Sequence, residues 1–330
     1  MRKKNIMRLK KTGTKFFFYI LRRLFKYLSP FIRLFEIKPI RKYASRQPEF
    51  PIVFIIGAPR SGSTILYQLI TNFFDVSYIN NLIHLSRENL FFGFWFSNLL
   101  YKNKKHNNFQ SNYGNTNKFG LNAPSEGGPI WYKWFSKEEI YFEKDSLSDK
   151  KVKQIRKHFY AIINKQQKPL IIKNLMTSQR LLPFSKIFPS AKFIFIKRLP
   201  EYNAQSIYKA RKKLSPHEWW SVKPKNYQDL LNFSLAEQSV KQVYYIEKQI
   251  MEDINLFPKK NIKIVNYEDL VSDYKNIFSE LISFIGCEFK EEILATNLDS
   301  GNNLKIDKEK FEQIKNNCNR FDWKNYKILK

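Results

Sequence analysis

IIGAPRSGSTIL, residues 55–66, connects the end of an apolar run to the start of a helical stretch through a loop that contains two glycines. The apolar run at 52–56 predicts a buried strand. Gly57 and Gly62 allow the backbone after that strand to approach a bound group closely. Because the first N–H groups of a helix attract anions, this loop predicts an anion-binding site.

The residue after the second glycine differs from that of the usual phosphate loop. A phosphate loop has Lys at this position, whereas this chain has Ser63 followed by Thr64. The cation of the loop is Arg60, which stands before Ser61 and Gly62. The plainer interpretation is a strand–turn–helix connection whose helix is capped by Ser61 or Ser63.

Short apolar runs alternate with helical stretches along the rest of the chain. Strands are predicted at 52–56, 76–79, 170–172, 193–197 and 262–266. Helices are predicted at 62–74, 148–165, 201–213, 227–254 and 269–285. Strands separated by helices predict an α/β fold, in which a mainly parallel sheet has helices on both faces. Ligands of such sheets bind beyond the carboxyl ends of the strands.

Two segments lie outside this alternation. We expect residues 1–48 to form a basic N-terminal arm and residues 49–330 to form the main domain. Within the domain, residues 81–147 are aromatic and rich in loop-forming residues, so we expect an insertion over the ligand edge that offers an acceptor pocket. Its aromatic side chains either contact a sugar face or a lipid tail, or pack as the core of the insertion.

The arm is the most basic part of the chain. The net charge is +29, and residues 1–48 contribute +14 through fifteen Lys and Arg against one acid, Glu36. A helix over 15–29, ending before Pro30, would place basic and apolar side chains on opposite faces. The basic face holds Lys15, Arg22 and Lys26, and the apolar face Phe17, Ile20, Leu21, Leu24 and Leu28. Such a helix either lies on an anionic membrane surface or packs against its own domain.

The ends of the predicted strands carry cations. Lys173 follows one strand, and Lys197 and Arg198 end another. The acids that follow the last strand, Glu268 and Asp269, are expected in the first turn of a helix, where acids are favourable. A ligand at this edge would thus be neutralised by side chains, so we expect no metal. Ser206 follows Arg198 by eight residues, and two turns of helix would bring its hydroxyl near the same edge.

At this point the chain resembles a family. Residues 60–64, Arg-Ser-Gly-Ser-Thr, resemble the 5′-phosphosulfate loop of sulfotransferases that use 3′-phosphoadenosine 5′-phosphosulfate (PAPS). Arg198 and Ser206, with their spacing of eight, resemble the 3′-phosphate motif of these enzymes. Residues 169–198 are similar to the stretch that carries a catalytic lysine in tyrosylprotein sulfotransferases and bacterial relatives, and Lys173 matches that lysine. The resemblance extends over roughly residues 50–290 and includes IVNYEDLVSD at 264–273.

The resemblance implies a P-loop NTPase-like sulfotransferase fold and PAPS as the sulfuryl donor. It implies that Arg60 and its loop bind the 5′-phosphosulfate, that Arg198 and Ser206 bind the 3′-phosphate, and that Lys173 stabilises the bridging oxygen. PAPS has no γ-phosphate, so a loop lysine is dispensable. In-line transfer to a hydroxyl then requires positioning, charge stabilisation and a base.

The base is where the chain departs from the family pattern. The tyrosylprotein group has a Glu about twenty residues after the loop cation, where this chain has Asn80 and Asn81. An amide cannot accept the proton. The candidates are Glu126, in the glycine-flanked loop NAPSEGGPIW at 122–131, then His84, with Glu88 as a further substitute.

The acceptor is expected to be a hydroxyl on a carbohydrate or glycolipid. Rival interpretations are a P-loop kinase that acts on a small molecule and a non-catalytic protein of membrane surfaces or nucleic acids. This chain lacks the loop lysine that a kinase needs. A non-catalytic protein would not need the ordered cations, so we expect no nucleic-acid partner. Cys287 and Cys318 show no metal or redox spacing, which favours a reducing compartment. We therefore expect a cytoplasmic protein, which reaches the inner face of the membrane peripherally if the arm lies on a membrane rather than on its own domain.

Overall fold

The computed structural model describes residues 2–328 except 103, 108, 113, 213–218, 291–297, 299 and 300. The strands are β1 (Ile52–Ile56), β2 (Ser77–Tyr78), β3 (Leu170–Lys173), β4 (Lys192–Lys197), β5 (Ile262–Asn266), β6 (Phe321–Asp322) and β7 (Lys327–Ile328). The first helices are α1 (Arg2–Tyr43), α2 (Ser63–Phe73), α3 (Asn81–Leu85), α4 (Leu90–Tyr101), α5 (Asp149–Gln166) and α6 (Leu181–Ile187). The later helices are α7 (Pro200–Arg211), α8 (Leu235–Asp253), α9 (Tyr267–Ser272), α10 (Tyr274–Ile285) and α11 (Lys308–Cys318).

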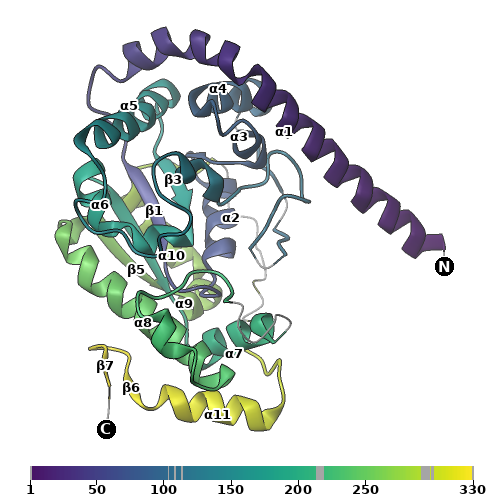
Figure 1. Ribbon diagram of the computed structural model, residues 1–330, viewed down its shortest axis with the longest axis vertical. Coiled ribbons are helices and arrows are strands. Elements are labelled where there is room, and N and C mark those ends of the chain that lie inside the picture. Colours follow the sequence, from purple (N-terminus) through teal and green to yellow (C-terminus); the bar gives the residue numbers. More distant parts are fainter. Residues whose placement is uncertain are drawn as a thin grey trace.

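A parallel sheet of five strands lies at the centre of the molecule (Figure 1). Its order is β2-β3-β1-β4-β5, and each neighbouring pair is parallel. Phe54 in the middle of β1 stands opposite Ile172 of β3 and Phe193 of β4. Because β1 is central, the loop that follows it emerges between the ends of β3 and β4. The predicted α/β fold with a mainly parallel sheet is confirmed.

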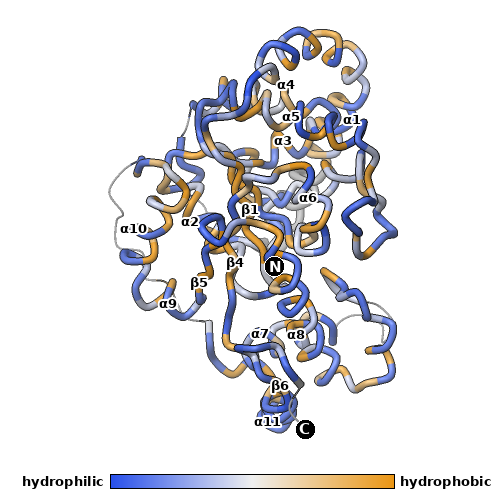
Figure 2. The backbone as a smooth tube through the Cα atoms, turned by 90° about the vertical axis from the view of Figure 1, so that its left-hand side faces the viewer, coloured by the Kyte–Doolittle hydropathy of each residue, from blue (hydrophilic) through white to orange (hydrophobic). Residues whose placement is uncertain are grey.

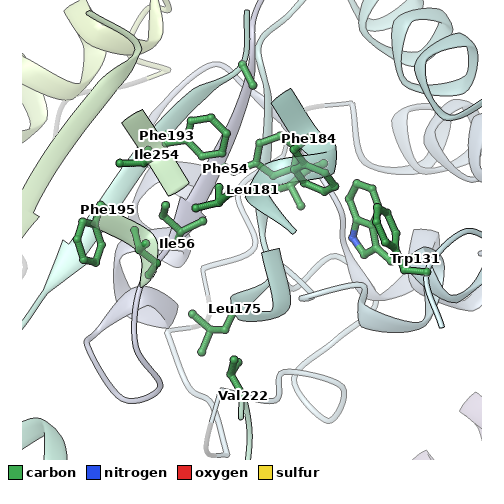
Figure 3. Close-up of a cluster of buried hydrophobic side chains, with 14 of the residues drawn as sticks. Phe54, Ile56, Trp131, Leu175, Leu181, Phe184, Phe193, Phe195, Val222 and Ile254 are labelled. Carbon is green, nitrogen blue, oxygen red and sulfur yellow. The ribbon is translucent and has the colours of Figure 1, made fainter. Parts of the chain in front are cut away.

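The sheet is buried on both faces, as the uniformly apolar strands require. On one face, Phe54 packs on Phe184 of α6 with ring centroids 4.9 Å apart, and Trp131 of the insertion joins the same cluster (Figure 3). On the other face, Val53 and Ile55 pack against α2 and α10. Figure 2 shows the hydrophobic colour concentrated in these central strands.

The insertion at 81–147 is more helical than predicted. It contains α3, α4 and the 3₁₀ helix η1 (Gly128–Lys133). Several of its aromatic side chains are buried in the core of the domain: Phe91, Phe94, Trp131, Trp134 and Phe135. For these residues the interpretation as core packing holds, whereas Trp95 is exposed.

The predicted end of the N-terminal helix before Pro30 is wrong. Helix α1 continues through Pro30 and Pro39 to Tyr43. A proline inside a helix costs one hydrogen bond and a steric clash, about 3 kcal/mol, which tertiary contacts can offset. Here the buried Glu36 accepts hydrogen bonds from the Asn89 side chain at 3.0 Å and from the Phe92 N–H. These contacts hold α1 against α4 across the top of the molecule in Figure 1.

Two other predicted helices begin or break at capping residues. The helix predicted from 227 begins at Leu235, because Ser234 accepts a hydrogen bond from Glu237 N at 3.3 Å and caps it. Residues 227–230 form only a 3₁₀ turn. The helix predicted over 269–285 is two helices, since Asp273 accepts a hydrogen bond from Asn276 N and begins α10.

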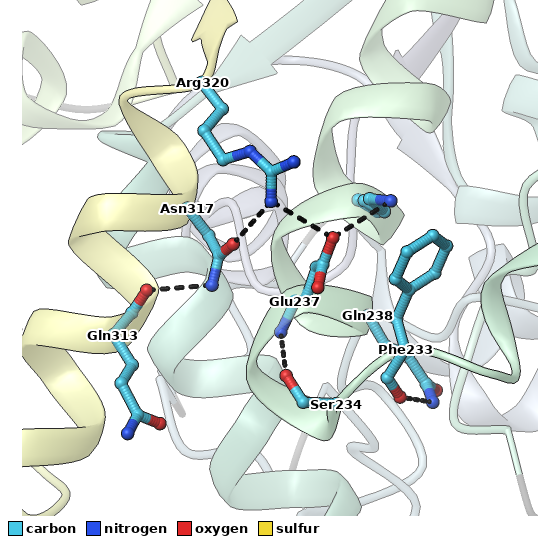
Figure 4. Close-up of polar contacts among 8 residues, drawn as sticks. Phe233, Ser234, Glu237, Gln238, Gln313, Asn317 and Arg320 are labelled. Atoms are coloured by element: carbon cyan, nitrogen blue, oxygen red, sulfur yellow. Dashed lines mark hydrogen bonds and ion pairs between the residues drawn. The ribbon is translucent and has the colours of Figure 1, made fainter.

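The C-terminal helix α11 packs on α8 and α7. Arg320, just after α11, lies 3.4 Å from the carboxylate of Glu237 and also donates to Asn317 (Figure 4). This helix and the small β6–β7 pair were not predicted, because their sequence is polar and lacks a long apolar run.

Candidate active site

The loop after β1 requires glycine at two positions. A Cβ on Gly57 would lie 2.5 Å from Ile196 O of β4, and one on Gly62 would lie 2.3 Å from Tyr267 Cδ2. Gly62 also has a φ of 94°, in the left-handed region that favours glycine. The loop therefore packs closely against β4 and against the start of α9.

Helix α2 begins directly at this loop. Its N-cap is Gly62, with no side-chain capping bond, so serine does not cap the helix as the plainer interpretation supposed. The hydroxyl of Ser61 is buried and has no hydrogen-bond partner among the described residues. Ser63 and Thr64 lie in the first turn, whose N–H groups have no intrahelical partner. These donors suit an anion.

The two arginines that were predicted to bind the nucleotide lie side by side. Arg60 has a φ of 69° and donates from Nε to the Ser206 hydroxyl at 2.9 Å. Arg198, at the end of β4, donates from Nη1 to the carbonyl oxygen of Arg60 at 3.2 Å. The structure thus brings the loop, the end of β4 and α7 together at one point of the sheet edge.

The guanidinium of Arg198 is also held by the chain after residue 300. It donates to Asn302 Oδ1 at 2.8 and 2.6 Å and to Gly301 O at 2.9 Å. The guanidinium carbon lies over the Tyr267 ring, 4.7 Å from its centroid. Burial lowers the pKa of Arg198 from its ordinary value, while the nearby Tyr267 and Glu268 oppose this shift. Arginine nevertheless keeps its charge in proteins.

Lys173 ends β3 on the other side of the loop. Its side chain is 2% exposed and forms an ion pair with Glu126, whose side chain is 38% exposed. Lys173 Nζ also donates to Thr64 Oγ1 at 3.2 Å. A Cβ on Gly114 would lie 3.2 Å from both Glu126 Oε1 and Thr64 Oγ1, so the backbone there closes over the pair.

These groups surround one cavity of about 410 Å³. Its wall includes the loop and helix start, the ends of β3 and β4, and parts of the insertion. The predicted residues that line it are Arg60, Gly62, Ser63, Thr64, Glu126, Lys173 and Arg198. A buried lysine, two arginines and helix N–H groups around one space can neutralise a ligand with several negative charges.

Comparison with known proteins identifies the family. The family model described as "Sulfotransferase family" matches residues 51–291. The chain belongs to the sulfotransferase family. It is therefore an enzyme that transfers a sulfuryl group, as the resemblance implied. The matched residues include every strand of the central sheet and every predicted site residue.

Solved sulfotransferase structures resemble the chain at low sequence identity. The sulfotransferase domain of the Synechococcus PCC 7002 olefin synthase is 20% identical, with 74% of this chain and 76% of that chain covered and a TM-score of 0.39. A sulfotransferase of Mycobacterium tuberculosis H37Rv is 14% identical, with 94% and 86% covered and a TM-score of 0.45. One of Alicyclobacillus acidocaldarius is 12% identical, with 82% and 91% covered and a TM-score of 0.43. No curated protein matches the chain.

Of the three candidate bases of this sulfotransferase, Glu126 lines the cavity beside Lys173, whereas His84 and Glu88 lie outside it. His84 lines a neighbouring cavity, and its Nδ1 lies 2.9 Å from the hydroxyl of Ser125. Burial, together with Arg87 and Arg22, lowers the pKa of His84 to about 4, so its ring is neutral at pH 7. Glu88 lines a further cavity beside α1. Its carboxylate lies 3.7 Å from Arg87 Nε. Of the three, Glu126 is the one beside Lys173.

Asn80 and Asn81, which stand where the resemblance to the tyrosylprotein group implied a glutamate, have structural contacts. Asn80 Oδ1 accepts from Ile83 N at 3.0 Å and caps α3. The Asn81 amide donates to Thr116 O and Gly120 O at 2.9 and 2.7 Å. Both side chains are buried, so they fix the start of α3 and the insertion loop.

The neighbours of the sulfotransferase site that sequence reasoning missed include Tyr267, Gly114 and Asn302. Tyr267 stands in the IVNYEDLVSD junction, and its place directly after β5 was a usable signal. Gly114 and Asn302 lie in segments without periodicity, where nothing in the sequence indicates an approach to the sheet edge.

The acids after β5 lie where they were predicted. Glu268 and Asp269 are in the first turn of α9, and Glu268 accepts from Leu199 N at 3.2 Å. In the part of the chain that the structure describes, no group of three or more His, Cys, Asp or Glu could hold a metal ion.

Proposed function

We propose that this sulfotransferase uses PAPS as its donor and transfers the sulfuryl group to a hydroxyl of a carbohydrate or glycolipid. The observation that carries the proposal is the chain of contacts from Ser206 through Arg60 to Arg198, beside the buried Lys173. PAPS presents a phosphosulfate and a separate 3′-phosphate. Two arginine-bearing turns at one sheet edge offer a complementary pair of cationic positions.

The residues present fit such a nucleotide. The loop at 57–62 and the first turn of α2 offer N–H groups for the 5′-phosphosulfate. The Arg198 guanidinium donates hydrogen bonds to the oxygens of Asn302, Gly301 and Arg60. A 3′-phosphate supplies acceptor oxygens of the same kind.

The transfer we propose uses Glu126 as the base. The acceptor hydroxyl gives its proton to the Glu126 carboxylate, and the acceptor oxygen forms a bond to sulfur. The bond between sulfur and the bridging oxygen breaks, and its electron pair stays on the 5′-phosphate. Lys173 and Arg60 stabilise that charge. The products are a sulfate ester and 3′,5′-adenosine bisphosphate, with the proton on Glu126.

We also propose that α1 places the enzyme at an anionic membrane surface, on the cytoplasmic side. In 15–29, the apolar side chains of Phe17, Ile20, Leu24 and Leu28 are 51, 47, 50 and 42% exposed, so the described domain does not cover them. Basic side chains on α1 are exposed as well: Arg22, Arg23, Lys26, Arg33, Lys38, Arg41 and Lys42. Exposed apolar groups interspersed with cations suit the interface of an anionic bilayer.

A cavity between α1 and α4 extends this surface. Its volume is about 750 Å³, and its wall includes Phe35, Phe92 and Trp95, with Lys38 and Lys42 beside them. None of the helices in the described part of the chain is both long and apolar enough to span a bilayer. The attachment we propose is peripheral, through the exposed face of α1, and it would bring the enzyme to lipid-linked acceptors.

Binding of 3′,5′-adenosine bisphosphate tests the donor assignment. We expect calorimetry to show binding of this product, with no comparable binding of ATP with Mg²⁺ or of single-stranded DNA. Arg198→Ala should weaken binding by at least about tenfold, since a charged hydrogen bond contributes roughly 1.5–3 kcal/mol. Arg46→Ala is the matched control, because Arg46 is exposed and its nearest acid, Glu49, is 3.9 Å away.

Because Arg198 also anchors Asn302 and Gly301, a second variant protects the test against misfolding. Ser206→Ala removes only a hydroxyl and should weaken bisphosphate binding while the melting temperature stays near that of the parent. Tighter binding of ATP with Mg²⁺ than of the bisphosphate would overturn the donor assignment.

A further inference from the structure

A second cavity, of about 600 Å³, lies next to the donor cavity. Helix α1, helix α3 and part of the insertion, namely Asn112, Asn115 and residues 117–119, line it. The two cavities share Trp220. Asn112 and Asn115 line the second cavity and exchange backbone hydrogen bonds of 2.9 and 3.0 Å. Gly114, between them in the chain, lines the donor cavity. The backbone of Asn112, Gly114 and Asn115 thus lies between the two spaces.

The second cavity has an excess of positive charge. Arg22 of α1 and Arg87, which follows α3, both line it, together with Lys118. Burial lowers the pKa of His84, and the positive charges of Arg87 and Arg22 lower it further, so both guanidiniums act on the same space as His84. In the described part of the chain, Arg87 pairs with the Glu88 carboxylate, which is 3.7 Å away and lines a different cavity, beside α1. An anion in this cavity would relieve the repulsion.

The rest of the wall suits a hydroxylated ring. Asn81 lines the cavity, and its carboxamide oxygen is buried without a hydrogen-bond partner among the described residues. Trp220 and Phe119 offer aromatic faces, and Asn117 offers an amide. Sugar and cyclitol rings bind through this combination of aromatic contact and polar side chains.

The second cavity is also connected to the proposed base. His84 lies 2.9 Å from the Ser125 hydroxyl, and that hydroxyl accepts from Gly127 N at 3.3 Å. Ser125 and Gly127 flank Glu126 in the chain. The orientation of Glu126 is therefore set by contacts that reach the wall of the second cavity.

We propose that this second cavity is the acceptor subsite and that it selects an anionic polyol, in which a phosphate or carboxylate is carried on the ring that also carries the reacting hydroxyl. The anion lies against Arg22 and Arg87, and the ring lies between Trp220 and the Glu126 side. This inference rests on the proposed function. The polyol is either soluble or the headgroup of a lipid. A lipid headgroup could reach the cavity because α1 both lines the cavity and carries the proposed membrane-binding surface.

Binding to the full chain saturated with 3′,5′-adenosine bisphosphate tests the selection. The probes are inositol 1-phosphate and glucuronic acid, each against its neutral parent, inositol or glucose. We expect at least one anionic probe to bind at least about tenfold more tightly than its parent. The double variant Arg22→Gln/Arg87→Gln should abolish that preference. Lys260→Gln, at an exposed residue that lines neither cavity, should keep it.

Sulfate transfer distinguishes the sources of the polyol. Transfer to phosphatidylinositol in vesicles but not to inositol 1-phosphate would show a lipid headgroup, and the reverse a soluble acceptor. Equal binding of anionic and neutral probes, or an unchanged preference in the double variant, would overturn the inference. Bisphosphate binding is the separate readout of the proposed function, because neither Arg22 nor Arg87 lines the donor cavity.

Discussion

The pair of Lys173 and Glu126 shows how one buried charge constrains the residues around it. An unpaired ammonium inside a protein costs several kcal/mol, and the Lys173 side chain is only 2% exposed. The Glu126 carboxylate and the Thr64 hydroxyl provide its partners. Because the Glu126 side chain remains 38% exposed, one side of the carboxylate faces the cavity and its entering acceptor.

We expect Glu126→Gln to reduce the turnover number by roughly 10²–10⁴-fold, the usual contribution of a general base. Binding of 3′,5′-adenosine bisphosphate should change little, since the amide removes proton acceptance but keeps the shape of the side chain. Sulfate transfer and calorimetry measure the two effects at a temperature where circular dichroism shows the variant folded.

The matched control is Glu139→Gln, which removes an exposed carboxylate from the same insertion. It should leave turnover unchanged. Near-parental turnover in Glu126→Gln would show that another group accepts the proton.

At the scale of elements, helix α8 depends on a carboxyl that is buried among C-terminal contacts. Glu247 accepts a hydrogen bond from the Tyr326 hydroxyl at 3.0 Å and lies 3.7 Å from Lys197 Nζ. Burial raises the pKa of Glu247 to about 7, although Lys197 and Tyr326 oppose the shift. Lys197, predicted at the ligand edge, thus turns toward α8 and also donates to Trp323 O.

The raised pKa of Glu247 makes stability depend on pH. The folded state keeps the proton up to a pH of about 7, whereas the unfolded chain loses it near 4.5, so stability is lost as the pH rises through this window. A shift of this size corresponds to about 3 kcal/mol. In Glu247→Gln the free energy of unfolding should fall less between pH 4.5 and 7.5, as measured by urea denaturation.

Glu252→Gln, on the same helix with its side chain 61% exposed, should follow the parent at every pH. A constant difference between the parent and Glu247→Gln across this range would contradict the assignment, because other groups titrate equally in both proteins.

At the scale of the whole molecule, α1 combines one narrow docked face with a broad exposed one. Phe25 packs edge-on against Phe92 and Phe96, with ring centroids 6.4 and 6.5 Å apart. On the exposed side, Phe31, Leu34 and Phe35 are 65, 67 and 80% exposed. Exposed apolar side chains of this density on a basic helix are typical of interaction surfaces.

We expect the full chain to pellet with vesicles that contain phosphatidylserine, and to do so less at high salt, because surface charges are screened. The variant Phe31→Ser/Leu34→Ser/Phe35→Ser should bind at least about tenfold more weakly. Its net charge is unchanged, and each fully buried side chain of this kind is worth about 1.5–3 kcal/mol.

Leu256→Ser/Leu304→Ser is the control, since both residues are about half exposed on the body of the domain, at 48 and 52%. Equal pelleting of the parent and the triple variant would show that the exposed face of α1 does not contact the bilayer.

The sequence by itself determined the central sheet and the donor loop. Apolar runs and helix periodicity are local properties, so the five strands were placed within a residue or two, and parallel order then brings their carboxyl ends to one edge. Lys173 and Arg198 were found because each stands at the end of a strand, and Arg60 because it stands in the loop that follows β1.

Only the tertiary structure decided the remaining features. The pairing of Glu126 with Lys173 spans 47 residues, and that of Arg198 with Asn302 spans 104. Helix α1 passes Pro30 because Glu36 is held by α4, not because of its own sequence. Such contacts join segments with no shared local pattern, and their free energy appears only when the folded core has brought them together.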